Sequence, residues 1–126
     1  MSPLIVVALS VAGGVGAVVR LVFDGFLRSR VKVAYPLGTT VINVTGSLLL
    51  GLVTGLALTH AMPIEWRLIV GTGFLGGYTT FSTASFETVR LAQEGRYAAA
   101  LGNGLGMFVI ALLAAGAGLW LGSLPW

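Results

Sequence analysis

Residues 71–87 read GTGFLGGYTTFSTASFE and form the most unusual part of an otherwise apolar chain. They belong to a segment without formal charge from Leu68 to Phe86, which is long enough to cross a membrane as a helix. Its midpoint carries a Gly-Gly pair and then five Ser or Thr residues among the seven residues 79–85. Glycine and β-branched Thr both weaken a helix. The pattern indicates either a continuous helix with polar groups or a broken helix whose freed carbonyls bind a cation.

The composition of the whole chain indicates a membrane protein. Of the 126 residues, 56% are apolar and 9% are charged, and the mean hydropathy is +0.98. A soluble domain carries about 25% charged residues, so this chain cannot cover a water-facing surface. The absence of cysteine excludes a disulfide scaffold, a cysteine nucleophile and a cysteine-ligated zinc site. A single histidine and the lack of paired carboxylates argue against an enzyme, and we expect no nucleic-acid partner.

The charged residues gather in short clusters, and the segments between the clusters predict four membrane spans in a single domain. The spans are residues 4–25, 37–59, 68–90 and 97–122, and all should be helices because backbone groups in lipid must be satisfied within the segment. The first connecting loop is expected to hold Arg28, Arg30 and Lys32. Glycines are dense in these spans, which is typical of closely packed membrane helices. The predicted fold class is therefore an all-α membrane protein.

Three sequence strings carry a resemblance to a known family. They are GFLGGYTTFST at residues 73–83 with Glu87 after it, GGVGAVVR at residues 13–20 and GTTVIN at residues 38–43. Together with the length and the four-span layout, they resemble the Fluc/CrcB fluoride channels. The resemblance implies an antiparallel dimer of two inverted subunits, with a break in the third span and two fluoride pores. It also implies a structural sodium ion where the two third spans cross, held by the backbone carbonyls of Gly76 and Thr79.

The same resemblance assigns roles to individual side chains. Asn43 would offer amide donors to the pore, and Phe81 would present the positive edge of its ring to an anion. Ser82 and Thr83 would continue the path with hydroxyl groups. Each residue also has a structural alternative: a helix–helix hydrogen bond for Asn43, packing for Phe81, and hydrogen bonds back to their own helix for the hydroxyls.

Two charged residues complete the expected site. The resemblance places Arg20 in a wide vestibule that attracts anions, although snorkelling of its side chain to the headgroups is an equal alternative. Glu87 is the only carboxylate in the third-span motif, and it is counted with the pore residues.

The sequence also departs from the family pattern. The second aromatic residue, expected three positions after Phe81, is replaced by Ala84, and Phe86 lies on another side of the helix. In the fourth span, Asn103, Met107 and Ala111 stand where relatives often carry Ser or Tyr.

Three functions are weighed against one another. The first is a passive channel that exports fluoride across the plasma membrane of a bacterial cell. The second is a weakly conducting or non-conducting subunit that completes a heterodimer. The third, a small proton-coupled multidrug exporter, needs a carboxylate at mid-membrane, and the first span has none before Asp24.

The distribution of basic residues predicts one main orientation. One side of the membrane would receive five Lys or Arg residues, at positions 28, 30, 32, 90 and 96, and the other side would receive Arg67 alone. This bias predicts that both termini lie outside the cytoplasm. An antiparallel dimer in the cell would then need a paralogue of opposite topology, although a homodimer of mixed insertion stays open.

Overall fold

The structure is a computed structural model that describes residues 2–31, 37–60 and 62–125, apart from the side chain of Ser82. Lys32 and its expected loop position therefore lie outside the described residues. The described segments are helical, in the order α1 (Pro3–Arg30), α2 (Leu37–Thr59), α3 (Ile64–Arg67), η1 (Leu68–Leu75), α4 (Gly76–Tyr78), α5 (Phe81–Gln93), α6 (Tyr97–Leu101), η2 (Gly102–Gly106) and α7 (Met107–Gly122). The two η segments are π-helical and continue directly into their α-helical neighbours.

Three helical segments are long and apolar enough to cross a membrane: residues 3–30, 37–59 and 97–122. The last two coincide with the bounds predicted for the second and fourth spans. The first is longer than predicted, because Ser2 caps its start and it continues through Arg28 and Arg30. The placement of these two arginines in a connecting loop was therefore wrong. Basic side chains in the last turn face the negative end of the helix dipole, which favours the extra turn.

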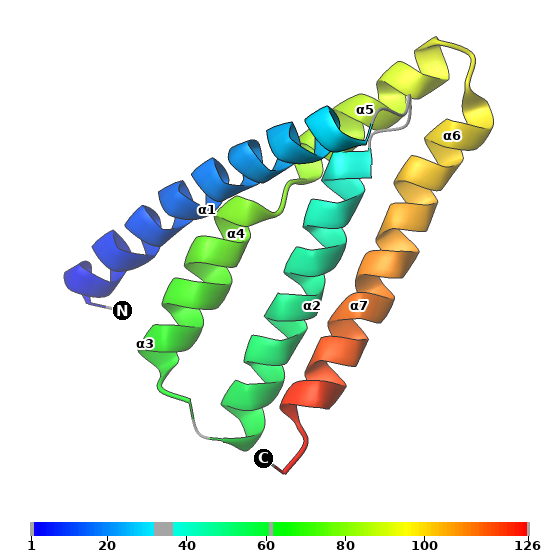
Figure 1. Cartoon of the computed structure of the whole chain (residues 1–126). Coiled ribbons are helices and arrows are strands. Elements are labelled where there is room, and N and C mark those ends of the chain that lie inside the picture. Colours follow the sequence, from blue (N-terminus) through cyan, green and yellow to red (C-terminus); the bar gives the residue numbers. More distant parts are fainter. Residues whose placement is uncertain (1, 32–36, 61, 126) are drawn as a thin grey trace.

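The predicted third span consists of two helical parts. The first part is formed by α3, η1 and α4 and ends at Tyr78, and the second part, α5, begins at Phe81. Together they extend beyond the predicted bounds 68–90 at both ends, since α3 starts at Ile64 and α5 ends at Gln93. Between them, Thr79 (φ −80°, ψ 157°) and Thr80 (φ −145°, ψ 122°) are extended. Figure 1 shows that the chain leaves α4 and enters α5 in a different direction.

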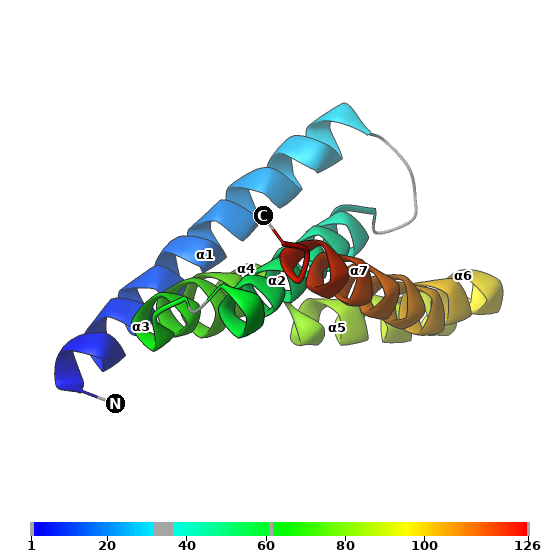
Figure 2. The ribbon, with the colours of Figure 1, turned by 90° about the horizontal axis from the view of Figure 1, so that it is seen from below.

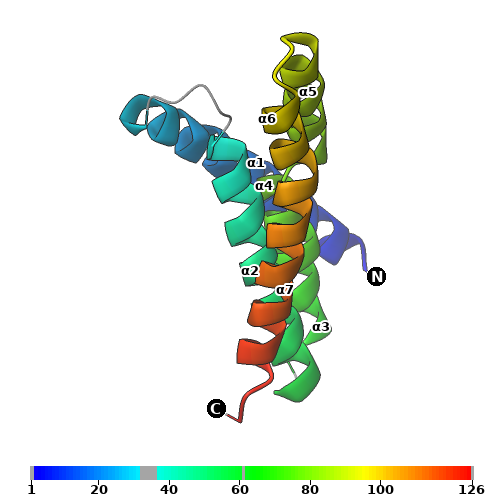
Figure 3. The same ribbon diagram turned by 90° about the vertical axis from the view of Figure 1, so that its right-hand side faces the viewer.

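Glycines bring the helices into close contact in two pairs. Helix α1 packs against η1 and α4, and α2 packs against α7, as the views in Figures 2 and 3 also show. A Cβ added at Gly16 would overlap the Phe74 carbonyl, and a Cβ added at Gly51 would overlap the Ala115 carbonyl. The expected role of glycine in packing is confirmed at these positions, whereas Gly14 faces open space.

The two ends of the molecule carry different connections. The end of α1, the start of α2 and the turn between α5 and α6 all lie in the upper part of Figure 1, although Figures 2 and 3 show that the end of α1 is set apart from the α5–α6 turn. The C-terminus, the end of α2 and the start of α3 lie at the opposite end (Figure 1). The buried apolar core between them is small, with Ile42, Leu75 and Tyr78 at its centre. Many large apolar side chains are exposed on the outer faces of the helices, as a lipid-facing surface requires.

Candidate functional site

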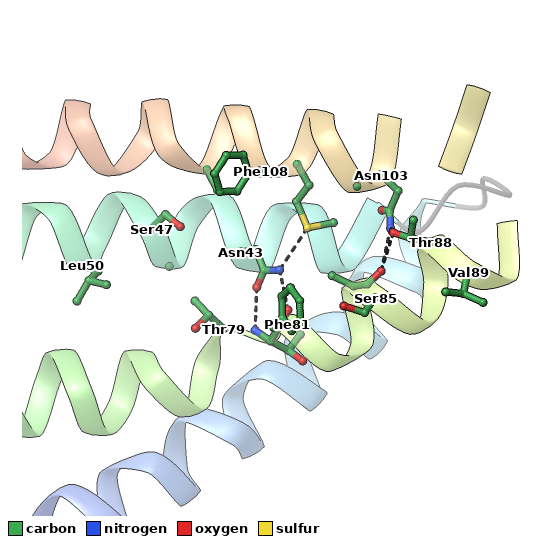
Figure 4. Close-up of a pocket in the computed structure, with 16 residues that line it drawn as sticks. Asn43, Ser47, Leu50, Thr79, Phe81, Ser85, Thr88, Val89, Asn103 and Phe108 are labelled. Atoms are coloured by element: carbon green, nitrogen blue, oxygen red, sulfur yellow. Dashed lines mark hydrogen bonds between the residues drawn. The ribbon is translucent and has the colours of Figure 1, made fainter. Parts of the chain in front are cut away.

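A cavity of about 540 Å³ lies beside the interruption between α4 and α5. Its walls come from α2, from the extended residues with α5, and from η2 with α7 (Figure 4). Seven lining residues carry an amide or a hydroxyl group, namely Asn43, Ser47, Thr79, Thr80, Ser85, Thr88 and Asn103. Among the described residues, none of those that line the cavity is ionisable. The cavity thus offers neutral hydrogen-bonding groups between apolar walls.

Asn43 connects α2 to the interruption through two backbone hydrogen bonds. Its Nδ2 donates to the Thr80 carbonyl at 2.8 Å, and its Oδ1 accepts from the Thr80 N–H at 2.8 Å. The second Nδ2 hydrogen points to the sulfur of Met107, 3.3 Å away. Thioether sulfur is a weak acceptor. Of the two Nδ2 hydrogens, this one can therefore be transferred to a better acceptor in the cavity with the smaller loss of hydrogen-bond energy. Asn43 therefore makes the inter-helix hydrogen bonds foreseen as its alternative role and also lines the cavity.

The same contacts change the hydrogen bonding at the end of α4. In an unbroken helix the Thr80 N–H would donate to the Gly76 carbonyl, but here it donates to Asn43. The Thr79 N–H keeps the ordinary helical hydrogen bond to the Leu75 carbonyl at 3.0 Å, and the Thr79 hydroxyl also donates to that carbonyl, at 3.0 Å. The Gly77 carbonyl accepts from Arg20 Nε at 3.4 Å. Arg20 thus lies beside the interruption, where its guanidinium supplies a donor to the end of a helix.

These residues are compatible with a hard cation bound by carbonyl groups. The Gly76 carbonyl has lost its helical donor, and a Cβ added at Gly76 would meet nothing closer than 4.0 Å, so this side of the helix is open. Carbonyl oxygens are ligands for hard cations. The described residues contain no group of three or more His, Asp or Glu side chains that would hold a metal ion instead.

Of the pore residues expected on α5, Phe81 lines the cavity and Thr83 does not. Phe81 lies at the cavity with 87% of its surface exposed, so packing within the chain does not explain it. The Thr80 hydroxyl accepts from the Thr83 N–H at 3.2 Å and donates to the Thr83 hydroxyl. Thr83 therefore belongs to the cap of α5 and is not among the cavity residues. The side chain of Ser82 is not described. Ala84, the departure from the family pattern, lies in the cavity wall.

Glu87 does not line the cavity either. It is buried, with 7% of its surface exposed, and its Oε2 lies 3.6 Å from Nη2 of Arg28 on α1. It is not among the residues that line the cavity, although Ala84, three residues earlier, and Thr88, the next residue, are. The structure thus brings together Asn43, Thr79 and Phe81, while Glu87 contacts another helix.

Asn103 has a role that the sequence analysis did not assign. It is 1% exposed, and its Nδ2 donates to the Ala84 carbonyl at 3.2 Å and to the Thr88 hydroxyl at 2.7 Å (Figure 4). It therefore links η2 to α5 across the cavity wall. Its position in a π-helical segment fits the frequent occurrence of such segments at functional sites. The available signal was an amide within the GNGLG run, which was noted only as a departure from the family.

The fold and the site define a class: a helical membrane protein with an interrupted helix beside a neutral polar cavity. Sequence comparison gives the family. The model of the family described as CrcB-like protein, Camphor Resistance (CrcB), matches residues 7–119. The fluoride-specific ion channel FluC 1 of Leifsonia xyli subsp. xyli is 68% identical, over 98% of this chain and 90% of the relative. FluC 2 of Cutibacterium acnes is 54% identical, over 89% of this chain and 92% of the relative.

FluC 2 of Mycolicibacterium paratuberculosis is 43% identical, over 92% of this chain and 88% of the relative. The chain therefore belongs to the CrcB family of fluoride-specific ion channels. The resemblance seen in the sequence is confirmed, and so is the expectation that the chain is not an enzyme, since the family is one of ion channels.

Proposed function

We propose that this chain forms a passive, fluoride-selective channel that lets fluoride leave the cytoplasm through the cavity beside α5. The observation that supports this most directly is the chemistry of the cavity wall, where amide and hydroxyl groups occur without an ionisable side chain among the described lining residues. Fluoride is small and strongly hydrated, so a pore must replace its water with donors. A lining carboxylate would repel the ion, and a lining cation would hold it too firmly to let it pass.

Within this pore, Asn43 and Phe81 are the residues that meet the ion. The Asn43 hydrogen that now points to Met107 can turn to a fluoride ion, while its bonds to Thr80 stay in place. The exposed Phe81 ring can offer its positive edge. Ser82 and Thr83 follow along α5, and Arg20 raises the local anion concentration near the interruption.

We further propose that the working unit is an antiparallel dimer with two pores and a central sodium ion. The exposure of Phe81 supports this, because a second subunit would cover a ring that this chain leaves open. The Gly76 and Thr79 carbonyls of two subunits would supply four oxygens. When bound, sodium would attract the partial negative charges of these carbonyl oxygens and so hold the two interruptions together where they cross.

The alternative is that this chain is a weakly conducting subunit of a heterodimer with a paralogue of opposite topology. Two observations favour it. Ala84 takes the place of the second aromatic residue in the cavity wall, and the basic residues Arg28 and Arg30 lie at the same end as the α5–α6 turn (Figure 1). The positive-inside rule would then place that end in the cytoplasm of a bacterial cell.

Fluoride efflux from liposomes that contain this chain alone tests the proposal. The wild-type protein should release fluoride and not chloride, and Asn43→Leu should remain dimeric but lose most of the flux. Thr54→Val is the matched control on α2, since the Thr54 hydroxyl, among the described residues, bonds only to the Leu50 carbonyl of its own helix, at 2.8 Å. Undiminished flux in Asn43→Leu would refute the role of Asn43. A silent wild-type protein that conducts after co-reconstitution with a paralogue would establish the heterodimer.

A further inference from the structure

Three charged groups form a chain between α1 and α5 next to the proposed pore. Arg28 Nε lies 3.1 Å from Asp24 Oδ2 one turn earlier on α1, and Arg28 Nη2 lies 3.6 Å from Glu87 Oε2 on α5. The Asp24 contact therefore holds the guanidinium from one side, while its other edge faces Glu87. Arg28 therefore forms ion pairs with two carboxylates.

The burial of these groups is unequal. The side chain of Arg28 is 63% exposed and that of Asp24 is 20% exposed, whereas only 9% of the Glu87 side chain is exposed. One oxygen of each carboxylate, Asp24 Oδ1 and Glu87 Oε1, is buried without a hydrogen-bond partner among the described residues. A buried carboxylate with one unpartnered oxygen depends strongly on the single cation that faces it.

No other described cation is paired with Glu87. On its own helix, Arg90 pairs with Glu94 at 3.6 Å. Helix α2 contributes no ionisable residue. At the start of α6 the ionisable groups are Tyr97, which is exposed, and the preceding Arg96. Arg28 is thus the only described cation in ion-pair contact with Glu87.

Glu87 directly precedes Thr88, which lines the cavity. Its charge is therefore close enough to act on an anion in the cavity, because fields are weakly screened in a low-dielectric surrounding. We propose that Arg28 is a positioning residue for conduction: its positive charge, held between Asp24 and Glu87, weakens the repulsion between the buried Glu87 carboxylate and fluoride. This inference rests on the proposed function and adds that the negative charge of Glu87 is an obstacle to fluoride, which the facing Arg28 reduces.

The test is fluoride efflux from liposomes with five variants of this chain, three with single substitutions at Arg28 or Arg30 and two for a double-mutant cycle. Arg28→Gln removes the cation and should lower the flux about tenfold, while Arg28→Lys keeps a cation and should retain at least half of the flux. Arg30→Gln is the matched control, because Arg30 lies over the Phe26 ring, 5.2 Å from its centroid, and is not paired with a carboxylate among the described residues. It removes the same charge from the same helix end and should leave the flux within twofold of wild type.

A double-mutant cycle separates charge compensation from a merely structural contact. In a Glu87→Gln background, Arg28→Gln should change the flux less than twofold, because there is no buried charge left to neutralise. An equal loss in both backgrounds would overturn the inference, and so would an Arg28→Lys protein as impaired as Arg28→Gln. A Glu87→Gln channel without flux would also overturn it, since the carboxylate would then be needed. If the variants give one of these results while the wild-type protein conducts fluoride, the inference on Arg28 fails and the proposed channel function stands. A wild-type protein without flux would instead refute the homodimeric channel.

Discussion

Two glycines on α1 provide a test of how the helices position the interrupted segment. A Cβ at Gly16 would overlap the Phe74 carbonyl oxygen and lie 3.0 Å from the Tyr78 nitrogen, whereas a Cβ at Gly14 would meet nothing within 4 Å. Gly16→Ala forces α1 to withdraw from η1 and α4 by roughly 1 Å, because backbone atoms in a packed interface cannot move aside independently. Overpacking of this kind costs about 1–3 kcal/mol. Each Gly→Ala change also returns up to about 1 kcal/mol of helix propensity.

The expected result is a difference between the two variants equal to the overpacking cost, about 1–3 kcal/mol. Gly14→Ala should be as stable as wild type or slightly more stable, and Gly16→Ala should be clearly less stable. Reversible unfolding in mixed micelles, followed by circular dichroism, measures both. Fluoride efflux should fall in Gly16→Ala as well, since α1 also brings Arg20 to the Gly77 carbonyl. Equal stability of the two variants would refute the close approach of α1 to α4.

Three further predictions test separate parts of the structure. Asn103→Leu removes both hydrogen bonds between η2 and α5, each worth about 0.5–1.5 kcal/mol, so it should destabilise the protein by about 1–3 kcal/mol and lower fluoride flux; wild-type stability would contradict the link. Replacing sodium by N-methylglucamine on both sides should lower dimer stability, and an unchanged stability would contradict a structural cation. Single cysteines at Ser2 and Ser29 in native membranes should be labelled from opposite sides, and equal labelling of both from both sides would show dual topology.

The helices of this chain could be predicted from sequence because the signal is local. Uncharged apolar segments between charge clusters gave the ranges 37–59 and 97–122, which coincide with the observed helical bounds. The Gly-Gly pair and the hydroxyl residues after it indicated either a continuous or a broken third span, and the structure has extended backbone at Thr79 and Thr80. The end of α1 was predicted too early, because Arg28 and Arg30 were taken for a loop although basic residues also suit the last turn of a helix.

The partners of the polar side chains could not be predicted in the same way. Asn43 and Thr80 are 37 residues apart, and Asn103 and Ala84 are 19 apart, so no local pattern connects them. The direction of Glu87 depends on where α1 crosses α5, which is a property of the packed fold. Sequence reasoning predicted which kinds of groups the site would carry, whereas the structure determines which donor meets which acceptor.

The hydrogen bonds around the interruption explain why it is tolerated at membrane depth. An interrupted helix frees backbone groups that lipid cannot satisfy, and here side chains supply the missing partners. Asn43 accepts from the N–H of Thr80 and donates to its carbonyl, and Arg20 donates to the carbonyl of Gly77. The Thr80 N–H, which would donate to the Gly76 carbonyl in an unbroken helix, donates to Asn43 Oδ1 instead. The contact that stabilises the extended residues is therefore the same contact that leaves a carbonyl oxygen for a cation, and it links the proposed sodium site to Asn43 in the proposed pore.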